Sequence, residues 1–572
     1  MNPKWNYQHP TPEMAKAALE LSKVIEISPI LSRLLIERGI NNKTDAIKYF
    51  NPQLSELYDP FLMNDMDTAV DRLNNAIDRN EKILIYGDYD VDGTTAVALV
   101  YNFLNLYYNN LDYYIPDRYS EGYGISKQGI DFAYDSGVKL IIVLDCGIKA
   151  INEIAYAKNR GIDFIVCDHH VPDNILPQAA AILNPKRFDS TYPFAHLSGC
   201  GVGFKFMQAF AIKNGSSFDH LMPFLDLVAV SIASDIVPIM DENRVLAHFG
   251  IKQLNSQPST GLRAIIKICG LSGKKLTIND IVFKIGPRLN ASGRISNGKE
   301  AVNLLVERDY NKALELSNQI DQYNDERKEY DKTMTEEANN IVDNLEGFAD
   351  RRSIVLFNEE WHKGVIGIVA SRLTEVYYRP AVVLSRTGDF ATGSARSVSG
   401  FDVYKAIESC KDLLESFGGH TYAAGLSMKI ENVQEFTKRF EEFVSNNIFP
   451  DQIIPSLNID ANIDFKDITP TFFKDLKKFQ PFGPDNPKPI FRTCNVFDYG
   501  TSKVVGRERE HIKLELIDNK TGNVLNGIAF GQCEHAAYIK TKRPFDICYT
   551  IEENSYKQGE LQLQIESIKP YH

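Results

Sequence analysis

Short, continuous apolar runs alternate with longer amphipathic stretches in the first half of the chain. Unbroken apolar runs of four to seven residues are typical of parallel strands that are buried on both faces. Helical spacing of apolar residues follows the first two runs, and Thr94 and Thr95 are the expected caps of the first helix. The pattern therefore predicts an α/β domain built on a parallel sheet. The expected strands are 83–86 (ILIY), 139–144 (KLIIVL) and 163–167 (DFIVC).

Acidic and histidine side chains follow the end of each predicted strand. They are Asp88, Asp90 and Asp92 after the first strand, Asp145 after the second, and Asp168, His169 and His170 after the third. A further apolar element, predicted as a helix over 224–232, ends at Asp235. Because open α/β sheets bind ligands at the carboxyl ends of their strands, we expect these side chains to share one site.

Clustered carboxylates need a cation or a raised pKa. Two of them about 4 Å apart repel by roughly 4 kcal/mol at an effective dielectric constant near 20. A calcium loop of the EF-hand type is excluded, because its twelfth position would be Leu99 rather than a glutamate. Taken singly, the first acids also fit an acidic turn, Asp235 fits a cap before a proline, and His169 fits a core histidine.

Taken together, four carboxylates and one imidazole suit two Mn²⁺ or Mg²⁺ ions better than structural zinc. The expected ligands are Asp88, Asp90, Asp145, His169 and Asp235. Two such ions are used for in-line phosphoryl displacement, so we expect phosphoester hydrolysis. His170 is expected to contact a non-bridging oxygen or to assist proton transfer.

Composition and charge limit the function classes. The chain has 572 residues, of which 44% are hydrophobic and 24% charged, which predicts three or four soluble globular domains. The N-terminus lacks an apolar signal region and no apolar run approaches twenty residues, so we expect a cytoplasmic protein without membrane association. Eight cysteines without a C-x-x-C pair indicate neither a zinc site nor a disulfide framework. The net charge of −12 argues against indiscriminate coating of nucleic acid but leaves a local basic groove open.

The pattern of elements predicts five segments. A charged run without glycine or proline predicts a solvated connecting helix, and short alternating stretches near the C-terminus predict antiparallel strands. The predicted segments are 1–75 (helical), 76–315 (α/β, parallel sheet), 316–349 (connecting helix), 350–450 (smaller α/β) and 451–572 (antiparallel β).

Four motifs in order resemble those of the DHH phosphoesterase superfamily. They are GDYDVDG (87–93), LDCG (144–147), CDHH (167–170) and SIASDIVP (231–238). The resemblance implies a DHH catalytic domain, a DHH-associated domain and a C-terminal OB-fold. It also implies that Asp92 and Asp168 orient ligands and backbone. Within the superfamily the chain resembles the metal-dependent exonucleases that degrade single-stranded DNA from the 5′ end to mononucleotides in DNA repair and recombination. A helicase and a single-strand-binding protein are the partners such an enzyme would have.

Two other functions remain open at this point. One is a phosphodiesterase of the same superfamily acting on short oligonucleotides or cyclic dinucleotides, and the other is a non-catalytic replication scaffold like the eukaryotic Cdc45 relatives. The segments at the two ends of the chain favour long DNA over short substrates. A scaffold that has lost its ligands would not keep all five ligand positions acidic or histidine.

The resemblance also implies substrate contacts. The implied residues are Arg118 in PDRYSEGYG, Arg288, Asn290 and Arg294 in KIGPRLNASGRI, Ser394 and Arg396 in GSARS, and Gly419 and His420 in FGGH. Arg118, Ser394 and Arg396 would hold a 5′ phosphate, with Gly419 and His420 beside the scissile nucleotide. A Gly-rich turn with a solvated arginine and a rigid interdomain turn are the alternatives for the first two segments.

The C-terminal segment offers further candidates for DNA contact. Three aromatic residues of the Pro-rich corner are expected to pack rather than to stack on bases, whereas three cations are better candidates for phosphate contact. The aromatic residues are Phe479, Phe482 and Phe491, and the cations are Lys503, Arg507 and Arg509.

Overall fold

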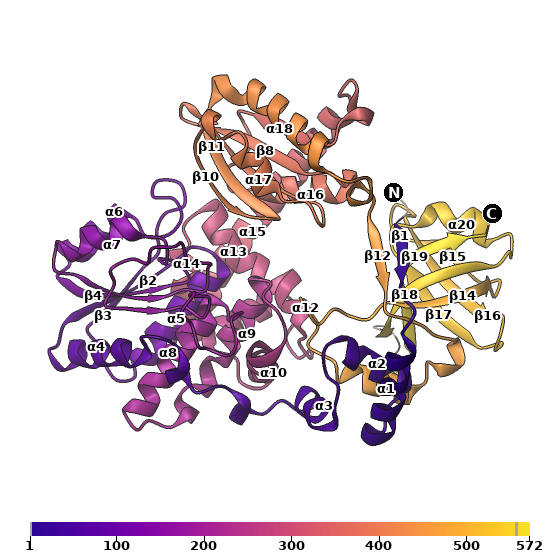
Figure 1. Ribbon diagram of the computed structural model, residues 1–572, viewed down its shortest axis with the longest axis horizontal. Helices are drawn as coiled ribbons and strands as arrows, with labels where there is room; N and C mark the ends of the chain where they lie inside the picture. The colour runs from indigo at the N-terminus through magenta and orange to yellow at the C-terminus, as the bar shows by residue number, and fades with distance from the viewer. Residues whose placement is uncertain (1–2, 555–556, 558, 572) are drawn as a thin grey trace. The chain divides into compact units, whose positions relative to one another are not determined.

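The computed structural model describes residues 3–554, 557 and 559–571 and divides into two compact units. One unit is residues 53–453, and the other is made by the two ends of the chain, up to Pro52 and from Ile454 (Figure 1). The pairing of the two ends in one unit was not indicated by any sequence pattern. The five segment boundaries given above stay predictions.

A five-stranded, fully parallel sheet forms the first layer of the 53–453 unit. Along each strand, alternate residues enter one or the other of two hydrophobic cores. The central strands are therefore buried on both faces, as the unbroken apolar runs predicted. The strand order is β3 (Leu111–Tyr114), β2 (Lys82–Gly87), β4 (Val138–Leu144), β5 (Asp163–Cys167) and β6 (Ala181–Leu183).

Helices cover both faces of this sheet (Figure 1). One face carries α4 (Met66–Asp78), α5 (Val91–Leu104), α8 (Gly199–Lys213) and α9 (Leu225–Ser234), and the other carries α6 (Lys127–Asp135) and α7 (Ile151–Lys158). The prediction of an α/β domain on a parallel sheet is confirmed.

The segment 284–295 is helical rather than the rigid turn that its glycines and proline allowed. A π-helical turn, Ile281–Ile285, leads directly into α13 (Gly286–Ile295), which has Pro287 in its first turn, where a missing N–H costs no hydrogen bond. The other helices of this region are α10 (Asp241–Ser256), α11 (Thr260–Ile268), α12 (Ile278–Asp280), α14 (Lys299–Val306) and the 34-residue connecting helix α15 (Tyr310–Asp343).

A mixed five-stranded sheet follows the connecting helix. In this sheet β7 (Ile354–Asn358) and β8 (Ala381–Thr387) are parallel, and every other pair of adjacent strands is antiparallel. The helix α16 (Ile366–Tyr377) and the end of α15 cover one face, while α17 (Val403–Glu408) and α18 (Val433–Asn447) cover the other. This confirms the smaller α/β domain. The strand order is β10 (Leu414–His420), β11 (Ala423–Lys429), β9 (Phe390–Arg396), β8 (Ala381–Thr387) and β7 (Ile354–Asn358).

The second unit is built around a seven-stranded sheet that closes on itself where β14 also pairs with β16. This barrel confirms the predicted C-terminal β domain, although its pairs β13–β14 and β17–β19 are parallel rather than antiparallel. The strand order is β13 (Ala461–Asn462), β14 (Phe491–Asp498), β18 (Phe545–Glu553), β19 (Leu561–Pro570), β17 (Val524–Ala529), β16 (His511–Asp518) and β15 (Lys503–Val505). Phe479 and Phe491 are fully buried, whereas Lys503, Arg507 and Arg509 are exposed.

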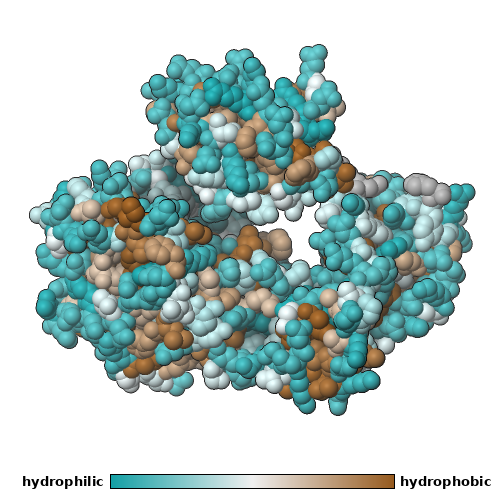
Figure 2. All heavy atoms as spheres, viewed as in Figure 1, coloured by the Kyte–Doolittle hydropathy of each residue, from teal (hydrophilic) through white to brown (hydrophobic). Residues whose placement is uncertain are grey.

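The N-terminal segment joins this barrel through a parallel pair of strands. They are β1 (Lys4–Tyr7) and β12 (Ser456–Ile459), and the helices α1 (Pro12–Ile25), α2 (Pro29–Glu37) and α3 (Lys43–Phe50) follow β1. Hydrophilic side chains cover most of the face seen in Figure 2, with scattered hydrophobic patches. No described helix is both long enough and apolar enough to cross a bilayer.

Candidate active site

The acids of the first motif are set by the start of α5. This helix begins at Val91, and its cap is Asp90, four residues before the first expected cap; Oδ1 of Asp90 accepts the N–H of Gly93 at 3.0 Å. The expected caps lie inside the helix instead, where the hydroxyl of Thr94 donates to the Asp90 carbonyl and that of Thr95 to the Val91 carbonyl, each at 2.7 Å. The early start turns the carboxylates toward the end of the sheet.

His169 presents a free lone pair to three carboxylates. Its Nδ1 lies 3.0 Å from the Leu197 carbonyl, which can only accept, so the proton is on Nδ1 and Nε2 is bare. Nε2 lies 3.2 Å from Oδ1 of Asp145, 3.6 Å from Oδ2 of Asp235 and 3.8 Å from Oδ2 of Asp92. These atoms converge as the ligands of a metal ion do.

Three buried ligand atoms in this cluster have no hydrogen-bond partner among the described residues. They are Oδ2 of Asp88, Nε2 of His169 and Oδ2 of Asp235. Burial, and after it repulsion from neighbouring carboxylates, raises the pKa of Asp88, Asp145 and Asp235 well above the usual value. Since buried polar atoms are normally satisfied, hard oxygen and imidazole donors left in this state fit a divalent cation such as Mn²⁺ or Mg²⁺.

Asp92 is held by the protein itself. Its Oδ2 accepts the N–H of Gly199 at 2.6 Å, and its Oδ1 accepts the N–H of Cys200 at 2.8 Å and the hydroxyl of Ser231 at 2.7 Å. Both oxygens are thus engaged at the positive N-terminal end of α8. This geometry suits the positioning role that the resemblance implied, although Asp92 also lies within the group around His169.

Asp168 fixes the two histidines that follow it. Its Oδ1 accepts the N–H groups of His169 at 2.7 Å and His170 at 3.0 Å and the Nδ1 of His170 at 2.7 Å, while its Oδ2 accepts the N–H of Ile148 at 2.9 Å. Burial lowers the pKa of His170, but the hydrogen bond to Asp168 and the negative charges of Asp168, Asp90 and Asp92 together outweigh burial and leave this pKa raised. Nε2 of His170 lies 3.3 Å from the hydroxyl of Tyr123, a contact that sequence reasoning missed.

Gly199 is a second residue that sequence reasoning missed. Asp145 has a positive φ of 60°, and a Cβ on Gly199 would lie 2.6 Å from the Cβ of Asp145 and 2.6 Å from its Oδ1. Only glycine lets the start of α8 approach this closely. The signal was present, because Ser198, which caps α8, precedes Gly199 and an apolar helix.

Unpaired cations gather near the acidic cluster. Arg118, Arg294, Arg396 and Lys363 form no ion pair with any described carboxylate. Burial, followed by the charges of Arg118 and Arg396, lowers the pKa of Arg294 to about 9, and burial and Arg118 lower that of Arg396. The charge of Arg118 also lowers the pKa of Asp88, so it acts on both the acidic cluster and the arginines. Half-buried cations that repel one another indicate an anion site.

The anion site is framed by β9 and the start of α16. Nη1 of Arg396 donates to the Ser394 hydroxyl at 2.9 Å, and Nη1 of Arg294 donates to the Gly364 carbonyl at 2.9 Å. A Cβ on Gly367, at the start of α16, would lie 3.0 Å from Oγ of Ser394, so the helix N-terminus approaches the same place. Helix N-termini favour bound anions.

Other residues named from the sequence lie differently. Arg288 is paired with Asp321 on α15, 2.7 Å from its Oδ1, and Asn290 is half-buried on α13. Gly419 has a φ of 144° in β10, and His420 ends that strand. Burial and the nearby charge of His170 lower the pKa of His420, which places it beside the histidine of the acidic cluster. The structure thus brings Arg118, Arg294, Ser394 and Arg396 together, and leaves Arg288 in a helix-to-helix ion pair.

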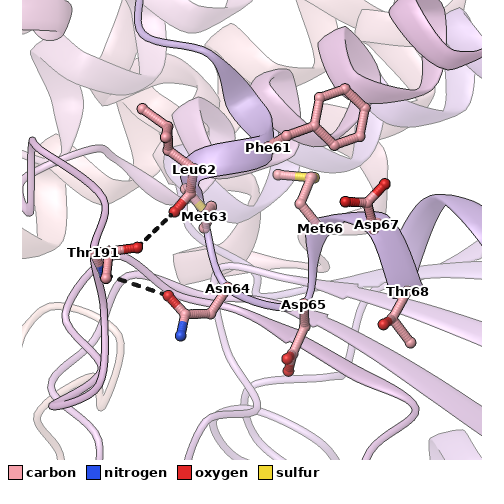
Figure 3. Close-up of a pocket in the computed structure, with 9 residues that line it drawn as sticks. All are labelled: Phe61, Leu62, Met63, Asn64, Asp65, Met66, Asp67, Thr68 and Thr191. Carbon is pink, nitrogen blue, oxygen red and sulfur yellow. Dashed lines mark hydrogen bonds between the residues drawn. The ribbon is translucent and has the colours of Figure 1, made fainter.

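A cavity of about 280 Å³ lies elsewhere in this unit, at the start of α4 (Figure 3). It is lined by residues 61–68 and Thr191, and none of them belongs to the acidic cluster. Its acids are neutralised, because Asp65 pairs with Arg187 and Asp67 with Lys213. The hydroxyl of Thr191 donates to the Leu62 carbonyl (Figure 3). We see no ligand site there.

Comparison with known proteins agrees with this geometry. Residues 82–232 match the DHH family N-terminal domain, 350–446 the DHHA1 domain and 459–567 the RecJ OB domain. The chain is 31% identical over 564 residues to the single-stranded-DNA-specific exonuclease RecJ of Escherichia coli, covering 95% of this chain and 96% of that protein. The chain belongs to the RecJ family.

Further relatives extend the likeness. RecJ of Bacillus subtilis is 38% identical over 515 residues, and the match covers 90% of this chain but spans 64% of the length of that protein. The crystal structure of RecJ from Thermus thermophilus in complex with Mn²⁺ has a TM-score of 0.85 at 23% identity, covering all of this chain and 80% of that one, which shows a common fold. A second RecJ structure, bound to manganese, has a TM-score of 0.60 at 28% identity and covers 70% of this chain and 98% of that one.

Proposed function

We propose that this RecJ family member hydrolyses single-stranded DNA from its 5′ end and releases 5′-mononucleotides. The observation that carries the proposal is the buried cluster of acids and one imidazole, with three unpartnered ligand atoms, beside a pocket of unpaired arginines. Relatives named single-stranded-DNA-specific exonuclease support the substrate class. Action in DNA repair and recombination, with a helicase and a single-strand-binding protein as partners, is part of the same proposal.

The ligands of two Mn²⁺ or Mg²⁺ ions would be Asp88, Asp90, Asp145, His169 and Asp235. Bound divalent cations supply a water of lowered pKa and stabilise charge on the phosphoryl group. The protein contributes the placement of these ligands, since Asp92 anchors the first motif to α8 and Asp168 fixes both histidines. His170, with Nδ1 held by Asp168, would contact a non-bridging oxygen or move a proton at Nε2.

The arginine pocket supports 5′ polarity. A terminal phosphate carries more negative charge than an internal one, so a cluster of half-buried cations without carboxylate partners among the described residues favours a phosphorylated terminus, as the 5′ end of a strand can be. In our proposal Arg118, Ser394 and Arg396 hold this phosphate, Arg294 adds charge, and Gly419 and His420 lie beside the scissile nucleotide. Because Arg118 acts on both Asp88 and the other arginines, the bound end lies next to the metal ligands.

The test is digestion of one DNA oligonucleotide, labelled at its 5′ end in one sample and at its 3′ end in another, with Mn²⁺ and with EDTA. We expect metal-dependent release of a 5′-labelled mononucleotide and progressive shortening of the 3′-labelled strand. Asp145→Ala should be inactive and still bind DNA. Intact long DNA together with cleaved dinucleotides would favour the short-substrate phosphodiesterase and overturn the proposal.

The polarity has its own test. Arg118→Gln should lose most of the preference for a 5′-phosphate over a 5′-hydroxyl terminus, because one cation of the pocket is gone while the metal ligands remain. Lys503→Gln, which changes an exposed cation on the barrel, serves as the control for a general loss of DNA affinity. An unchanged preference in Arg118→Gln would reject this pocket as the phosphate site.

A further inference from the structure

The fifth strand of the parallel sheet, β6, delivers a lysine to the same edge of the sheet as the acids. β6 pairs with β5, and the N–H of Asp168 donates to the carbonyl of Leu183, the last residue of β6, at 3.0 Å. The chain continues as Asn184, Pro185 and Lys186. Since β2, β4 and β5 place the proposed metal ligands at this edge, the side chain of Lys186 starts in the same layer.

Asn184 ties the backbone of Lys186 to the DHH motif. Asn184 is fully buried, and its Nδ2 donates to the carbonyl of His170 at 2.9 Å while its Oδ1 accepts the N–H of Lys186 at 2.7 Å. One side chain therefore fixes the position of Lys186 relative to His170. Both hydrogen-bonding groups of this buried amide are satisfied, so the backbone at Lys186 is held in one position relative to the DHH motif.

The ammonium of Lys186 lies among charged groups of the site without pairing with any of them. It is half-buried, and the described residues include no carboxylate within 4.0 Å of it. Its charge nevertheless acts on Asp235, Asp168 and His420. By contrast, Lys149, the other lysine that acts on His420, pairs with Asp173 at 3.3 Å and is exposed.

We propose that the ammonium of Lys186 contacts a non-bridging oxygen of the scissile phosphate and stabilises the charge that develops there. This inference rests on the proposed function. In the reaction water attacks phosphorus, the bond from phosphorus to the 3′ oxygen breaks, and that oxygen leaves with a proton. The products are a mononucleotide with a 3′-hydroxyl and a shortened strand with a new 5′-phosphate. Lys186 stays protonated throughout the reaction. Its flexible side chain lets the ammonium follow the oxygen as the phosphoryl group changes geometry.

The experiment compares Lys186→Met and Lys186→Arg with the wild type and with Lys158→Met, an exposed lysine on α7 that serves as the matched control. Loss of a preorganised donor to a developing charge lowers kcat by about 100- to 1000-fold. We expect this loss in Lys186→Met, with KM and Mn²⁺ affinity by calorimetry unchanged, and partial activity in Lys186→Arg. Lys158→Met should match the wild type.

A phosphorothioate at the scissile linkage tests the contact itself. In the wild type, sulfur in place of the contacted oxygen should slow one diastereomer more than the other. In Lys186→Met that difference should shrink, which a purely structural lysine would not cause.

Two results would overturn the inference: a kcat of Lys186→Met within about 3-fold of the wild type, or a loss of kcat accompanied by a loss of Mn²⁺ binding. If the wild type itself leaves single-stranded DNA intact, the proposed function fails, and the inference falls with it.

Discussion

The substitution Gly199→Ala tests how tightly the start of α8 controls the acidic cluster. The added Cβ would meet Asp145 at 2.6 Å from Cβ and 2.8 Å from Cα. Carbon atoms do not approach to 2.6 Å without bonding, so Asp145 or the first turn of α8 must move by the order of 1 Å. The same turn holds both oxygens of Asp92 through the N–H groups of Gly199 and Cys200, so the two carboxylates would shift together.

The magnitudes separate an effect on activity from an effect on stability. Inserting a methyl group into a packed site costs about 1–3 kcal/mol. Replacing a helical glycine by alanine returns about 1 kcal/mol, and the φ of Gly199 is not positive, so alanine meets no backbone strain. The free energy of unfolding should therefore fall by about 0–2 kcal/mol. A displacement of about 1 Å in a catalytic group, however, costs about 100-fold in rate.

The assay is the initial rate of Mn²⁺-dependent digestion of a 5′-phosphorylated oligonucleotide, with Mn²⁺ affinity from calorimetry and stability from urea unfolding. Gly201→Ala, in the same turn, is the matched control, because its Cβ would lie 3.3 Å from Oγ of Ser198 and touch no acid. We expect at least about 100-fold less activity for Gly199→Ala and a rate near that of the wild type for Gly201→Ala. Wild-type rate and Mn²⁺ affinity in Gly199→Ala would refute the reasoning.

Three other predictions follow from buried charges. Lys205→Met should lower the free energy of unfolding in urea by about 3–5 kcal/mol, because it leaves the fully buried Glu242 without its ion pair. The double variant Lys205→Met/Glu242→Met should lose less free energy of unfolding, and an equal loss would contradict this explanation. Mn²⁺ affinity should rise with pH, with release of protons, above the range in which ordinary carboxylates titrate, because burial and neighbouring carboxylates raise the pKa of Asp88 and Asp145. Calorimetry in buffers of different ionisation enthalpy measures the protons released, and a pH-independent affinity would count against the prediction. Burial raises the pKa of Asp226 from 3.8 to about 6, so between these two pH values the folded state holds a proton that the unfolded state has lost. The free energy of unfolding therefore falls as the pH rises through this range. Asp226→Asn should flatten this pH dependence in urea unfolding, and an unchanged dependence would assign it to other groups.

The layout of the acidic cluster could be predicted because it follows from two regularities. Unbroken apolar runs identify buried parallel strands, and parallel strands end at one edge of the sheet. Asp88, Asp145 and His169 are each the first or second residue after a strand, so the topology alone places them together. Their ligand chemistry then follows from residue type. The individual roles of these residues are not fixed by topology and stay predictions.

Contacts between distant segments could not be predicted in the same way. The pairing of β1 with β12 joins residues about 450 positions apart, and nothing in the alternation of four residues specifies a partner. The anion site likewise depends on which arginines find no carboxylate. Arg288 and Arg294 lie in the same motif, yet Arg288 meets Asp321 on the connecting helix whereas Arg294 meets none. The family resemblance implied substrate contact for both, because a shared motif reports residue type and not pairing.

The segment 284–295 shows why glycine and proline are ambiguous signals. Both residues are common in turns, but glycine also occurs where two backbones approach closely, and proline is tolerated in the first turn of a helix. A Cβ on Gly286 would lie 2.8 Å from Oγ of Ser234, and one on Gly293 would lie 2.5 Å from the carbonyl oxygen of Tyr89. These glycines therefore let α13 pack against the residues next to Asp235 and Asp88. The same small residues that suggest a turn in isolation are required by a helix that packs closely beside the acidic cluster.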